Sequence, residues 1–279
     1  MGQLDGKVAF ITGGGRGQGR SHAIMLAQEG ADIAFCDVRL QYHTIPYAMN
    51  SDGDMEQTVQ LVEALGRRCL AVEADVRDSA QVESAVERVI EELGQIDILC
   101  ANAGIWAPAQ IVEMEDELWH DVIETNLSGA FYAMRAVGRH MRERGAGRIV
   151  VTSSMCGRQG TQNLGAYCAS KWGVIGLVKT AAIELGPYDV AVNAVCPTMV
   201  DTPMIVNEVL DGMFRPDLEA PTRETSEEVV RAAMHKLPVG YYGPEEISKA
   251  VLFLVSDQAR YITGSALDVS AGKATEWSA

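Results

Sequence analysis

The sequence has no excess of positive charge and no long apolar run. Its 279 residues include 23 Lys and Arg against 38 Asp and Glu, which gives a formal net charge of −15. Binding of a polyanion depends on basic side chains that neutralise phosphates, so this balance argues against a nucleic-acid partner. No uncharged stretch is long enough to span a bilayer, and the N-terminus has no signal-peptide pattern. We expect a cytoplasmic protein without membrane association.

Metal-binding patterns are also lacking. The six cysteines have no paired spacing of the zinc-site kind, and the five histidines form no cluster of possible ligands. Most of the cysteines fall in or beside apolar segments, where a thiol acts as a small hydrophobic group. The sequence therefore predicts a reducing compartment and no metal centre.

The sequence does contain a regular alternation of strand-like and helix-like segments. Strands are expected at residues 8–12, 32–37, 69–75, 96–101, 148–153, 191–196 and 266–269. Helices are expected at residues 19–29, 54–65, 79–93, 116–144, 165–185 and 244–256. The strands are almost continuously apolar, as in a parallel sheet with helices on both faces. With no linker or repeat, we expect one α/β domain, 1–279, with a Rossmann-type, doubly wound, parallel seven-stranded sheet.

Two segments depart from this alternation. Residues 38–53 form an insertion after the second strand, and residues 203–239 separate the sixth strand from the last helix. Loops of this length are usually functional or disordered. The second segment has an apolar face at roughly helical spacing, made of Met204, Ile205, Val209, Leu210, Met213 and Phe214. We expect it to be a substrate lid, and the alternative is a face packed permanently against a neighbouring subunit.

A glycine-rich turn joins the first strand to the first helix. It contains Gly13, Gly17 and Gly19 in the order Gly-x3-Gly-x-Gly, which differs from the Gly-x-Gly-x-x-Gly fingerprint. Glycines allow close backbone approach, so the turn can present amide N–H groups and a helix N-terminus to a pyrophosphate. Its place after the first strand favours a dinucleotide site over a simple tight turn.

The second strand ends at Asp37, whose carboxylate can accept hydrogen bonds from the hydroxyls of an adenosine ribose. It would also repel the 2′-phosphate of NADP. Two alternatives remain: Asp37 only caps a turn, or Arg16 in the glycine turn binds that phosphate. Because a fixed carboxylate beside a dianion is costly while a long Arg side chain can move into solvent, NAD is the predicted cofactor.

Tyr167 and Lys171 are four residues apart, which places them on one face of a predicted helix. A phenol titrates near pH 10, so it needs a lowered pKa to act as a base at neutral pH. A neighbouring ammonium and a positively charged nicotinamide both favour the phenolate. Ser154 lies at the end of the fifth strand, where its hydroxyl can hold a substrate oxygen. The set predicts acid/base catalysis by Tyr167.

These motifs together resemble the short-chain dehydrogenase/reductase family over essentially the whole chain. In the family's order they are Thr12-Gly13-x3-Gly17-x-Gly19, Asp75, Asn102-Ala103-Gly104, Asn126, Ser154, Tyr167-x3-Lys171 and Asn193-x3-Pro197. The resemblance implies an enzyme that interconverts a secondary alcohol and a ketone, and a homotetramer.

The resemblance also assigns roles to single residues. It implies that Tyr167 is the general acid/base, that Ser154 orients the substrate oxygen, and that Lys171 binds the nicotinamide ribose and lowers the tyrosine pKa. Asn126 would bend its helix and hold a water of the proton relay. The implied cofactor-binding residues are Gly13, Arg16, Gly17, Gln18, Gly19, Asp37, Asp75, Val76, Asn102, Ala103, Gly104, Tyr167, Lys171, Pro197, Val200 and Thr202.

Some of these cofactor contacts are more specific. The resemblance implies that Asp75 and Val76 meet the adenine, and that Thr202 and the Val200 backbone hold the carboxamide. Residues 16–23 and the insertion after the second strand are similar to the actinobacterial carveol-dehydrogenase-like group. Members of that group are often linked to the redox cofactor mycofactocin, and their insertion is thought to cover a NAD that is recycled in place.

The substrate expected from these features is a small apolar, alicyclic, carveol-like secondary alcohol. Residues flanking the serine and the Pro197 turn could line an apolar pocket: Met155, Cys156, Gln159 and Met199. A hydroxysteroid dehydrogenase and a 3-oxoacyl-carrier-protein reductase are alternatives, although Asp37 and the net charge of −15 speak against the latter. A non-catalytic, cofactor-sensing protein is an alternative of another class, which the intact Ser154, Tyr167 and Lys171 argue against.

Overall fold

The protein, in a computed structural model that describes residues 2–51 and 53–276, is built on a parallel β-sheet. Residues 1, 52 and 277–279, which belong to the expected domain and its insertion, lie outside the described part. The strands are β1 (Val8–Thr12), β2 (Asp32–Asp37), β3 (Cys69–Glu73), β4 (Ile98–Ala101), β5 (Gly147–Thr152), β6 (Val190–Pro197) and β7 (Ala266–Val269). Within the described residues the seven strands run in the order β3-β2-β1-β4-β5-β6-β7, all parallel. The predicted Rossmann-type sheet is confirmed.

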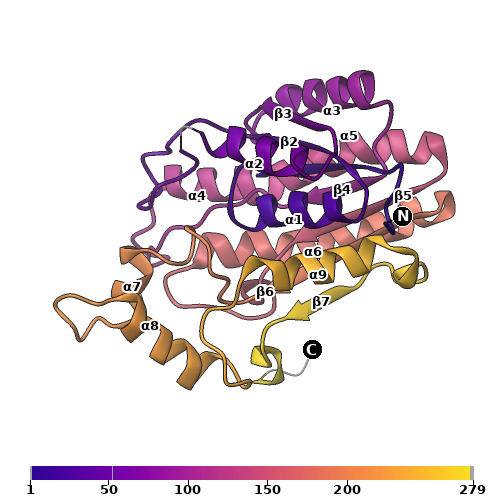
Figure 1. The fold of residues 1–279 in the computed structure, drawn as a ribbon. Helices are drawn as coiled ribbons and strands as arrows, with labels where there is room; N and C mark the ends of the chain where they lie inside the picture. The colour runs from indigo at the N-terminus through magenta and orange to yellow at the C-terminus, as the bar shows by residue number, and fades with distance from the viewer. Residues whose placement is uncertain (1, 52, 277–279) are drawn as a thin grey trace.

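Helices cover both faces of this sheet (Figure 1). The helices α1 (Gly17–Gln28), α2 (Asp54–Glu63) and α9 (Pro244–Val255) lie on one face, and α3 (Ser79–Leu93), α5 (Gly129–Arg144) and α6 (Gly165–Leu185) lie on the other. In β1, Ala9 and Ile11 pack into the first layer, while Val8 and Phe10 pack into the second. Because successive side chains of a strand point to opposite faces, a strand covered on both sides must be apolar throughout.

The segment expected as one helix at residues 116–144 is interrupted. It consists of α4 (Asp116–Ile123), a π-helical turn (Glu124–Ser128) and α5. Asn126 lies in the π turn, where its Oδ1 accepts a 2.8 Å hydrogen bond from the Ile105 N–H and its Nδ2 donates to the Ile105 carbonyl at 2.9 Å. A π turn inserts one residue into an α-helix and is often found at functional sites.

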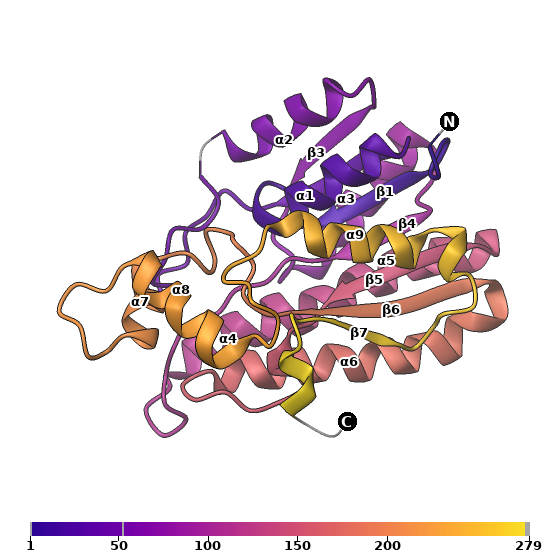
Figure 2. The same ribbon diagram turned by 60° about the horizontal axis from the view of Figure 1, so that its bottom comes forward.

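The two irregular segments lie next to each other at the carboxyl ends of the strands. Residues 38–51 form no helix or strand, as expected, whereas the segment 203–239 contains α7 (Glu208–Phe214), α8 (Arg223–Val229) and a second π turn (Val230–Met234). Figure 2 shows α7 and α8 beyond the ends of the strands. Helix α1 begins at Gly17, earlier than expected, and other bounds shift slightly. None of the helices in the described part of the chain is long and apolar enough to cross a membrane.

Candidate active site

A cavity opens over the carboxyl ends of the strands. Its walls are the glycine turn after β1, the ends of β2, β4, β5 and β6, the first turns of α6, and parts of the two irregular segments. The space between its atoms amounts to about 1120 Å³, including the open mouth. Sheets of this strand order bind ligands at the carboxyl ends of their strands, at the point where the strand order reverses between β1 and β4. The cavity is therefore the candidate active site.

Most of the predicted site residues line this cavity. They are Gly13, Arg16, Gly17, Gln18, Asp37, Val76, Asn102, Ala103, Gly104, Ser154, Tyr167, Lys171, Pro197 and Thr202. Four predicted residues, Gly19, Asp75, Asn126 and Val200, do not line it. Gly19 packs against Gly13 and Asn126 is hydrogen-bonded to Ile105, so both support residues that line the cavity.

The glycine turn needs its glycines for two physical reasons. Gly13 and Gly17 have φ values of +69° and +54°, in the left-handed region that side chains disfavour. A Cβ on Gly19 would lie 2.0 Å from the Gly13 carbonyl oxygen, and one on Gly13 would lie 2.9 Å from the Cα of Ala103. The turn can therefore pack this closely against β4 and enter α1 only because these positions carry no side chain.

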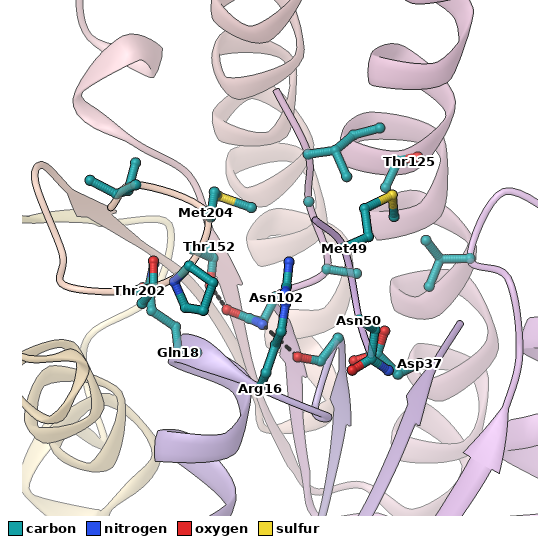
Figure 3. A pocket seen from close by; sticks show the side chains of 18 of the residues that line it. Arg16, Gln18, Asp37, Met49, Asn50, Asn102, Thr125, Thr152, Thr202 and Met204 are labelled. Carbon is teal, nitrogen blue, oxygen red and sulfur yellow. Dashed lines mark hydrogen bonds between the residues drawn. The ribbon is translucent and has the colours of Figure 1, made fainter. Parts of the chain in front are cut away.

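Asp37 both supports the glycine turn and lines the cavity. Its Oδ2 accepts a 2.8 Å hydrogen bond from the Gly15 N–H, and its Oδ1 accepts one of 2.9 Å from the Val38 N–H. Burial raises the pKa of the Asp37 carboxyl, although these two hydrogen bonds oppose the shift. Figure 3 shows Asp37 next to Asn50 of the insertion. The Asp37 carboxylate thus caps the glycine turn and also lies in the cavity wall, where a ribose acceptor was expected.

Arg16 does not extend into solvent, contrary to the argument that favoured NAD over NADP. Its Nη2 donates a 2.6 Å hydrogen bond to the carbonyl of Ala48 in the insertion. The guanidinium therefore joins the glycine turn to the loop that follows β2. This contact engages the side chain that the alternative hypothesis assigned to a 2′-phosphate.

Lys171 and Tyr167 are brought together at the inner end of the cavity. The Nζ of Lys171 donates a 2.8 Å hydrogen bond to the Thr152 carbonyl and lies 5.5 Å from the centroid of the Tyr167 ring. The lysine is only 3% exposed, and burial lowers its pKa to about 8. Tyr167 and Lys171 therefore lie on the same face of α6, as predicted.

The pKa of Tyr167 differs from expectation. Burial raises the pKa of the phenol well above its ordinary value, and the Ser154 side chain opposes that shift. Lowering of this pKa by Lys171 was expected, but in the protein alone desolvation outweighs any effect of the ammonium. The phenol oxygen of Tyr167 consequently retains its proton.

The remaining predicted residues organise the strand ends. Thr12 Oγ1 accepts hydrogen bonds from the N–H groups of Asn102 (3.0 Å) and Ala103 (3.1 Å), which joins the ends of β1 and β4. Ser154 has extended backbone, and its Oγ accepts a 3.1 Å hydrogen bond from the Cys156 N–H. Thus Ser154 stays at the rim of β5, where its side chain faces the Tyr167 phenol.

Asp75 is held beside the cavity by an ion pair and a hydrogen bond. Its Oδ2 pairs with Arg77 Nη2 at 2.7 Å, and its Oδ1 accepts a 3.2 Å hydrogen bond from the Tyr42 hydroxyl. Arg77 also pairs with Asp121 at 2.6 Å. These partners hold the Asp75 carboxylate outside the cavity wall, which Val76 reaches instead. The adenine contact that the family resemblance implies for Asp75 and Val76 stays a prediction.

Residues of the insertion were missed as site residues, whereas Met204 and Ile205 belong to the apolar face expected of the lid. Tyr42, Tyr47 and Met49 of the insertion line the cavity together with Met204 and Ile205. None of the expected pocket residues Met155, Cys156, Gln159 and Met199 is among the lining residues of the described chain. Two tyrosines within a long loop were the available signal, since loops rarely carry buried aromatic side chains.

Trp106 connects these two segments. Its ring stacks on Tyr47 with centroids 5.6 Å apart, and its backbone N–H donates a 3.1 Å hydrogen bond to the Tyr47 hydroxyl. Its Nε1 donates to the Met204 carbonyl at 2.9 Å. Trp106 is only 3% exposed and does not line the cavity, so it holds the walls rather than contacting the contents.

The sequence profile of the family described as short chain dehydrogenase matches residues 7–211. The chain belongs to this family. Among its relatives is (-)-trans-carveol dehydrogenase of Rhodococcus erythropolis, which is 44% identical over 98% of this chain and 99% of that protein. The family resemblance inferred from the sequence is confirmed, and so is the similarity to carveol dehydrogenases.

Solved structures of short-chain dehydrogenases share the whole fold. Carveol dehydrogenase from Mycobacterium avium in complex with NAD matches with a TM-score of 0.96 and 44% identity over 99% of this chain and 100% of that one. A short chain dehydrogenase from Mycobacterium paratuberculosis bound to NAD matches with a TM-score of 0.89 and 35% identity, over 99% and 100% of the two chains. Within the described residues, no group of three His, Cys, Asp or Glu side chains is placed to hold a metal ion.

Proposed function

We propose that the chain is a single-domain, NAD-dependent oxidoreductase that interconverts a small apolar secondary alcohol and its ketone, with Tyr167 as acid/base. The observation that carries this proposal is one cavity with Ser154, Tyr167 and Lys171 at its inner end and Asp37 at the other. The relatives named for carveol dehydrogenase activity and the structures that contain NAD support the same function.

The residues present fit NAD. The glycine turn offers a cradle that a Cβ on Gly19 would fill, and Asp37 provides the ribose acceptor. Among the described residues that line the cavity, three buried side-chain oxygens have no hydrogen-bond partner: Gln18 Oε1, Asn50 Oδ1 and Thr125 Oγ1. Buried polar atoms are normally satisfied, so these are suited to donors of a ligand. When bound, NAD takes up a hydride from the alcohol carbon, or returns it as NADH.

The chain's own residues supply the proton chemistry. In ketone reduction the Tyr167 hydroxyl donates its proton to the substrate oxygen, and in alcohol oxidation the phenolate takes that proton up. Ser154 donates its hydroxyl hydrogen to the same oxygen and thus sets its position. The Lys171 ammonium stabilises the phenolate electrostatically once bound substrate and cofactor have displaced water.

Asn126 acts through other residues in this proposal. Its carboxamide is bonded to Ile105 and donates a 3.1 Å hydrogen bond to the Ser170 hydroxyl. Ser170 lies one residue before Lys171 on α6, so Asn126 couples the π turn to the helix that carries the catalytic pair. We assign it a positioning role, in addition to the relay water that the family resemblance implies.

A neutral, apolar substrate fits the apolar part of the cavity wall. Ile105, Tyr47, Met204 and Ile205 supply apolar surface there, and the charged lining residues are the ones already assigned to cofactor and catalysis. The resemblance adds two further elements to the proposal: a NAD recycled in place through mycofactocin, and a homotetramer. The exposed aromatic side chains Phe131 and Trp172 on α5 and α6 are consistent with burial in such an assembly.

A panel of substrates tests the proposal. Carveol, a hydroxysteroid and a 3-oxoacyl thioester are supplied with NAD(H) or NADP(H), and nicotinamide absorbance is followed in parallel with reduction of a dye acceptor. We expect NAD-dependent oxidation of the small alicyclic alcohol. Exclusive NADPH-dependent reduction of the thioester would favour the carrier-protein reductase, and tight NAD binding without turnover of any substrate would favour a non-catalytic sensor.

A further inference from the structure

A histidine near the end of the segment 203–239 is bonded to the turn that precedes this segment. His235 follows the π turn Val230–Met234, and its Nε2 lies 2.7 Å from the Oγ1 of Thr198. Thr198 belongs to the turn after β6, residues 198–202, and lines the cavity. His235 is only 4% exposed and does not line the cavity. A buried side chain outside the cavity thus holds a residue of the cavity wall.

The hydrogen bonds of His235 determine which of its ring nitrogens carries the hydrogen. Nδ1 lies 3.1 Å from the Val239 carbonyl oxygen, which can only accept, so Nδ1 is the donor. Burial lowers the pKa of His235 below its ordinary value, so the ring is neutral near pH 7. In a neutral imidazole the second nitrogen is an acceptor. The Thr198 hydroxyl therefore donates its hydrogen to His235 Nε2.

Tyr242 binds the backbone of the same turn. Its hydroxyl accepts a 3.1 Å hydrogen bond from the Thr198 N–H and donates one of 2.5 Å to the carbonyl of Val269 in β7. Its backbone carbonyl accepts a 2.8 Å hydrogen bond from the Asp201 N–H. The rings of His235 and Tyr242 lie against each other, with centroids 5.7 Å apart. The two residues together therefore fix both a side chain and the backbone of the turn after β6.

The turn after β6 lies at the catalytic end of the cavity. In the sheet, β6 is the neighbour of β5, which Ser154 follows, whereas β1 and β4 separate β5 from β2, which ends at Asp37. The reacting carbon of NAD has to meet the substrate beside Tyr167, so the nicotinamide belongs at this end and the adenosine near Asp37. A displacement of the turn after β6 should therefore disturb the nicotinamide site and leave the adenosine site unchanged.

We propose that His235 is a positioning residue for the nicotinamide half of the cofactor, because through Thr198 and together with Tyr242 it fixes the turn after β6 in the cavity wall. The proposal rests on the proposed function, since it takes the nicotinamide to lie beside the catalytic residues. The family resemblance implies contacts of Val200 and Thr202 with the carboxamide. His235 and Tyr242 would hold the backbone that carries those contacts.

Equilibrium binding of two ligands tests the proposal. ADP-ribose has the adenosine, the pyrophosphate and the second ribose of NAD but lacks the nicotinamide. Both ligands are titrated by calorimetry into wild type and His235→Ala. We expect the affinity for NAD to fall roughly 3–10-fold, as for loss of one hydrogen bond, and the affinity for ADP-ribose to stay unchanged. Unchanged NAD affinity overturns the proposal, and so does an equal loss for both ligands, which a general disturbance of the fold would cause.

Three variants sharpen the result. Thr198→Val keeps the shape of the side chain but removes the hydroxyl, so it should reproduce the selective loss of NAD affinity. His235→Gln offers a carboxamide oxygen to the Thr198 hydroxyl and should recover most of that affinity. His120→Ala removes an exposed histidine on α4 and should keep both wild-type affinities. Wild-type NAD affinity in Thr198→Val, or a glutamine variant as weak as the alanine variant, contradicts the role of this hydrogen bond.

Steady-state kinetics give an independent readout. His235→Ala should raise the KM for NAD, while the KM for the alcohol at saturating NAD should change little, because the residue does not line the cavity. A raised KM for the alcohol with an unchanged KM for NAD would place the effect at the substrate and overturn the proposal. If the wild type turns over no alcohol, the proposed function fails, and the two titrations still decide whether His235 acts on the nicotinamide half.

Discussion

The Nη2 of Arg16 donates a 2.6 Å hydrogen bond to the carbonyl of Ala48, and so joins the glycine turn to the insertion across the mouth of the cavity. Hydrogen bonds within the insertion also stabilise its shape. Gln41 Nε2 donates to the carbonyls of Ile45 (3.0 Å) and Tyr47 (3.2 Å). Its Oε1 accepts a 2.8 Å hydrogen bond from the Met49 N–H. The loop therefore has an internally supported shape, and Arg16 is its link to the cofactor end of the cavity.

Removal of this link should accelerate release of the cofactor. A hydrogen bond from a charged group is worth about 1.5–3 kcal/mol, so Arg16→Ala should raise the NAD dissociation rate roughly tenfold or more. Stopped-flow measurement of NADH fluorescence after mixing with excess NAD gives this rate. Arg88→Ala, on the exposed face of α3, is the matched loss of an arginine and should keep the wild-type rate. An unchanged rate in Arg16→Ala would mean that the insertion does not retain the cofactor.

Tyr167→Phe should abolish turnover and leave NAD binding nearly intact. The substitution removes the phenol oxygen that holds the proton, while the ring remains stacked near Lys171. General acid/base groups contribute about 10²–10⁴-fold to a rate. Steady-state rates and NAD titrations by tryptophan fluorescence report the two properties separately. A Phe variant that retains more than about a tenth of the wild-type rate would exclude Tyr167 as the acid/base.

Discrimination between NAD and NADP should depend on the charge of Asp37. Asp37→Asn keeps an oxygen that can accept the Gly15 hydrogen bond but loses the charge, whereas Asp37→Ala loses both. We expect discrimination to collapse in both variants, and thermal stability to fall mainly in Asp37→Ala. Parallel titrations with the two cofactors and melting curves separate the effects. A preference of the wild type for NADPH would disprove the assignment.

The sheet and the positions of Ser154, Tyr167 and Lys171 in the cavity could be predicted from the sequence for a physical reason. A strand covered by helices on both faces is apolar at every position, so β1 and β2 have the predicted bounds. Ser154 and the Tyr167–Lys171 pair are placed by local geometry, because a strand end and an i, i+4 spacing fix where the side chains point. These features need no knowledge of distant contacts.

The features that were missed depend on partners far away in the sequence. The family resemblance implies a bend at Asn126, but the bonds to Ile105 that accompany the π turn could not be predicted, nor could the bonds of Asp75 to Arg77 and Tyr42. Helices α7 and α8 have seven residues each, too few for a helical period to be read reliably.

His22 should make the protein sensitive to acid. It is fully buried between α1 and α9, its Nδ1 bonds to the Ser248 hydroxyl at 2.8 Å, and burial lowers its pKa from 6.5 to about 4. Between these two values the unfolded chain binds more protons than the folded one, so the free energy of unfolding falls as the pH falls. The contribution amounts to about 2 kcal/mol between pH 7 and pH 5.

Urea unfolding of wild type and His22→Gln across this range measures that contribution. The glutamine can bond to Ser248 but does not titrate, so its stability should fall less steeply below pH 6.5. His120→Gln removes an exposed histidine on α4 and should follow the wild-type curve. Parallel curves for wild type and His22→Gln would show that His22 is not the titrating group.

The segment 203–239 offers a last test, of the substrate lid. Its apolar side chains, among them Leu210 and Phe214, pack in the same cluster as Trp106 and Tyr167, so the face covers its own cavity. Hydrogen bonds attach the segment to the rest of the fold near both of its ends. Trp106 Nε1 donates to the Met204 carbonyl, and near the other end Thr198 Oγ1 lies 2.7 Å from His235 Nε2 while the Ala271 carbonyl accepts from the Lys236 N–H. Between these attachments, Arg223 at the start of α8 forms an ion pair with Asp201.

Hydrogen exchange should distinguish a lid from a fixed element. Closure over an apolar substrate excludes water from the reacting atoms, so the backbone amides of α7 should exchange quickly in the apo protein and slow markedly with NAD and a substrate analogue bound. Amides of α9, which packs on the opposite side of the sheet from α6, should exchange equally in both states. Trp106→Phe, which removes the bond to Met204, should increase exchange in α7 further in the apo state. Equal protection of α7 with and without ligands would instead identify a permanently packed element, held by this chain or by a neighbouring subunit, and the lid hypothesis would have to be abandoned.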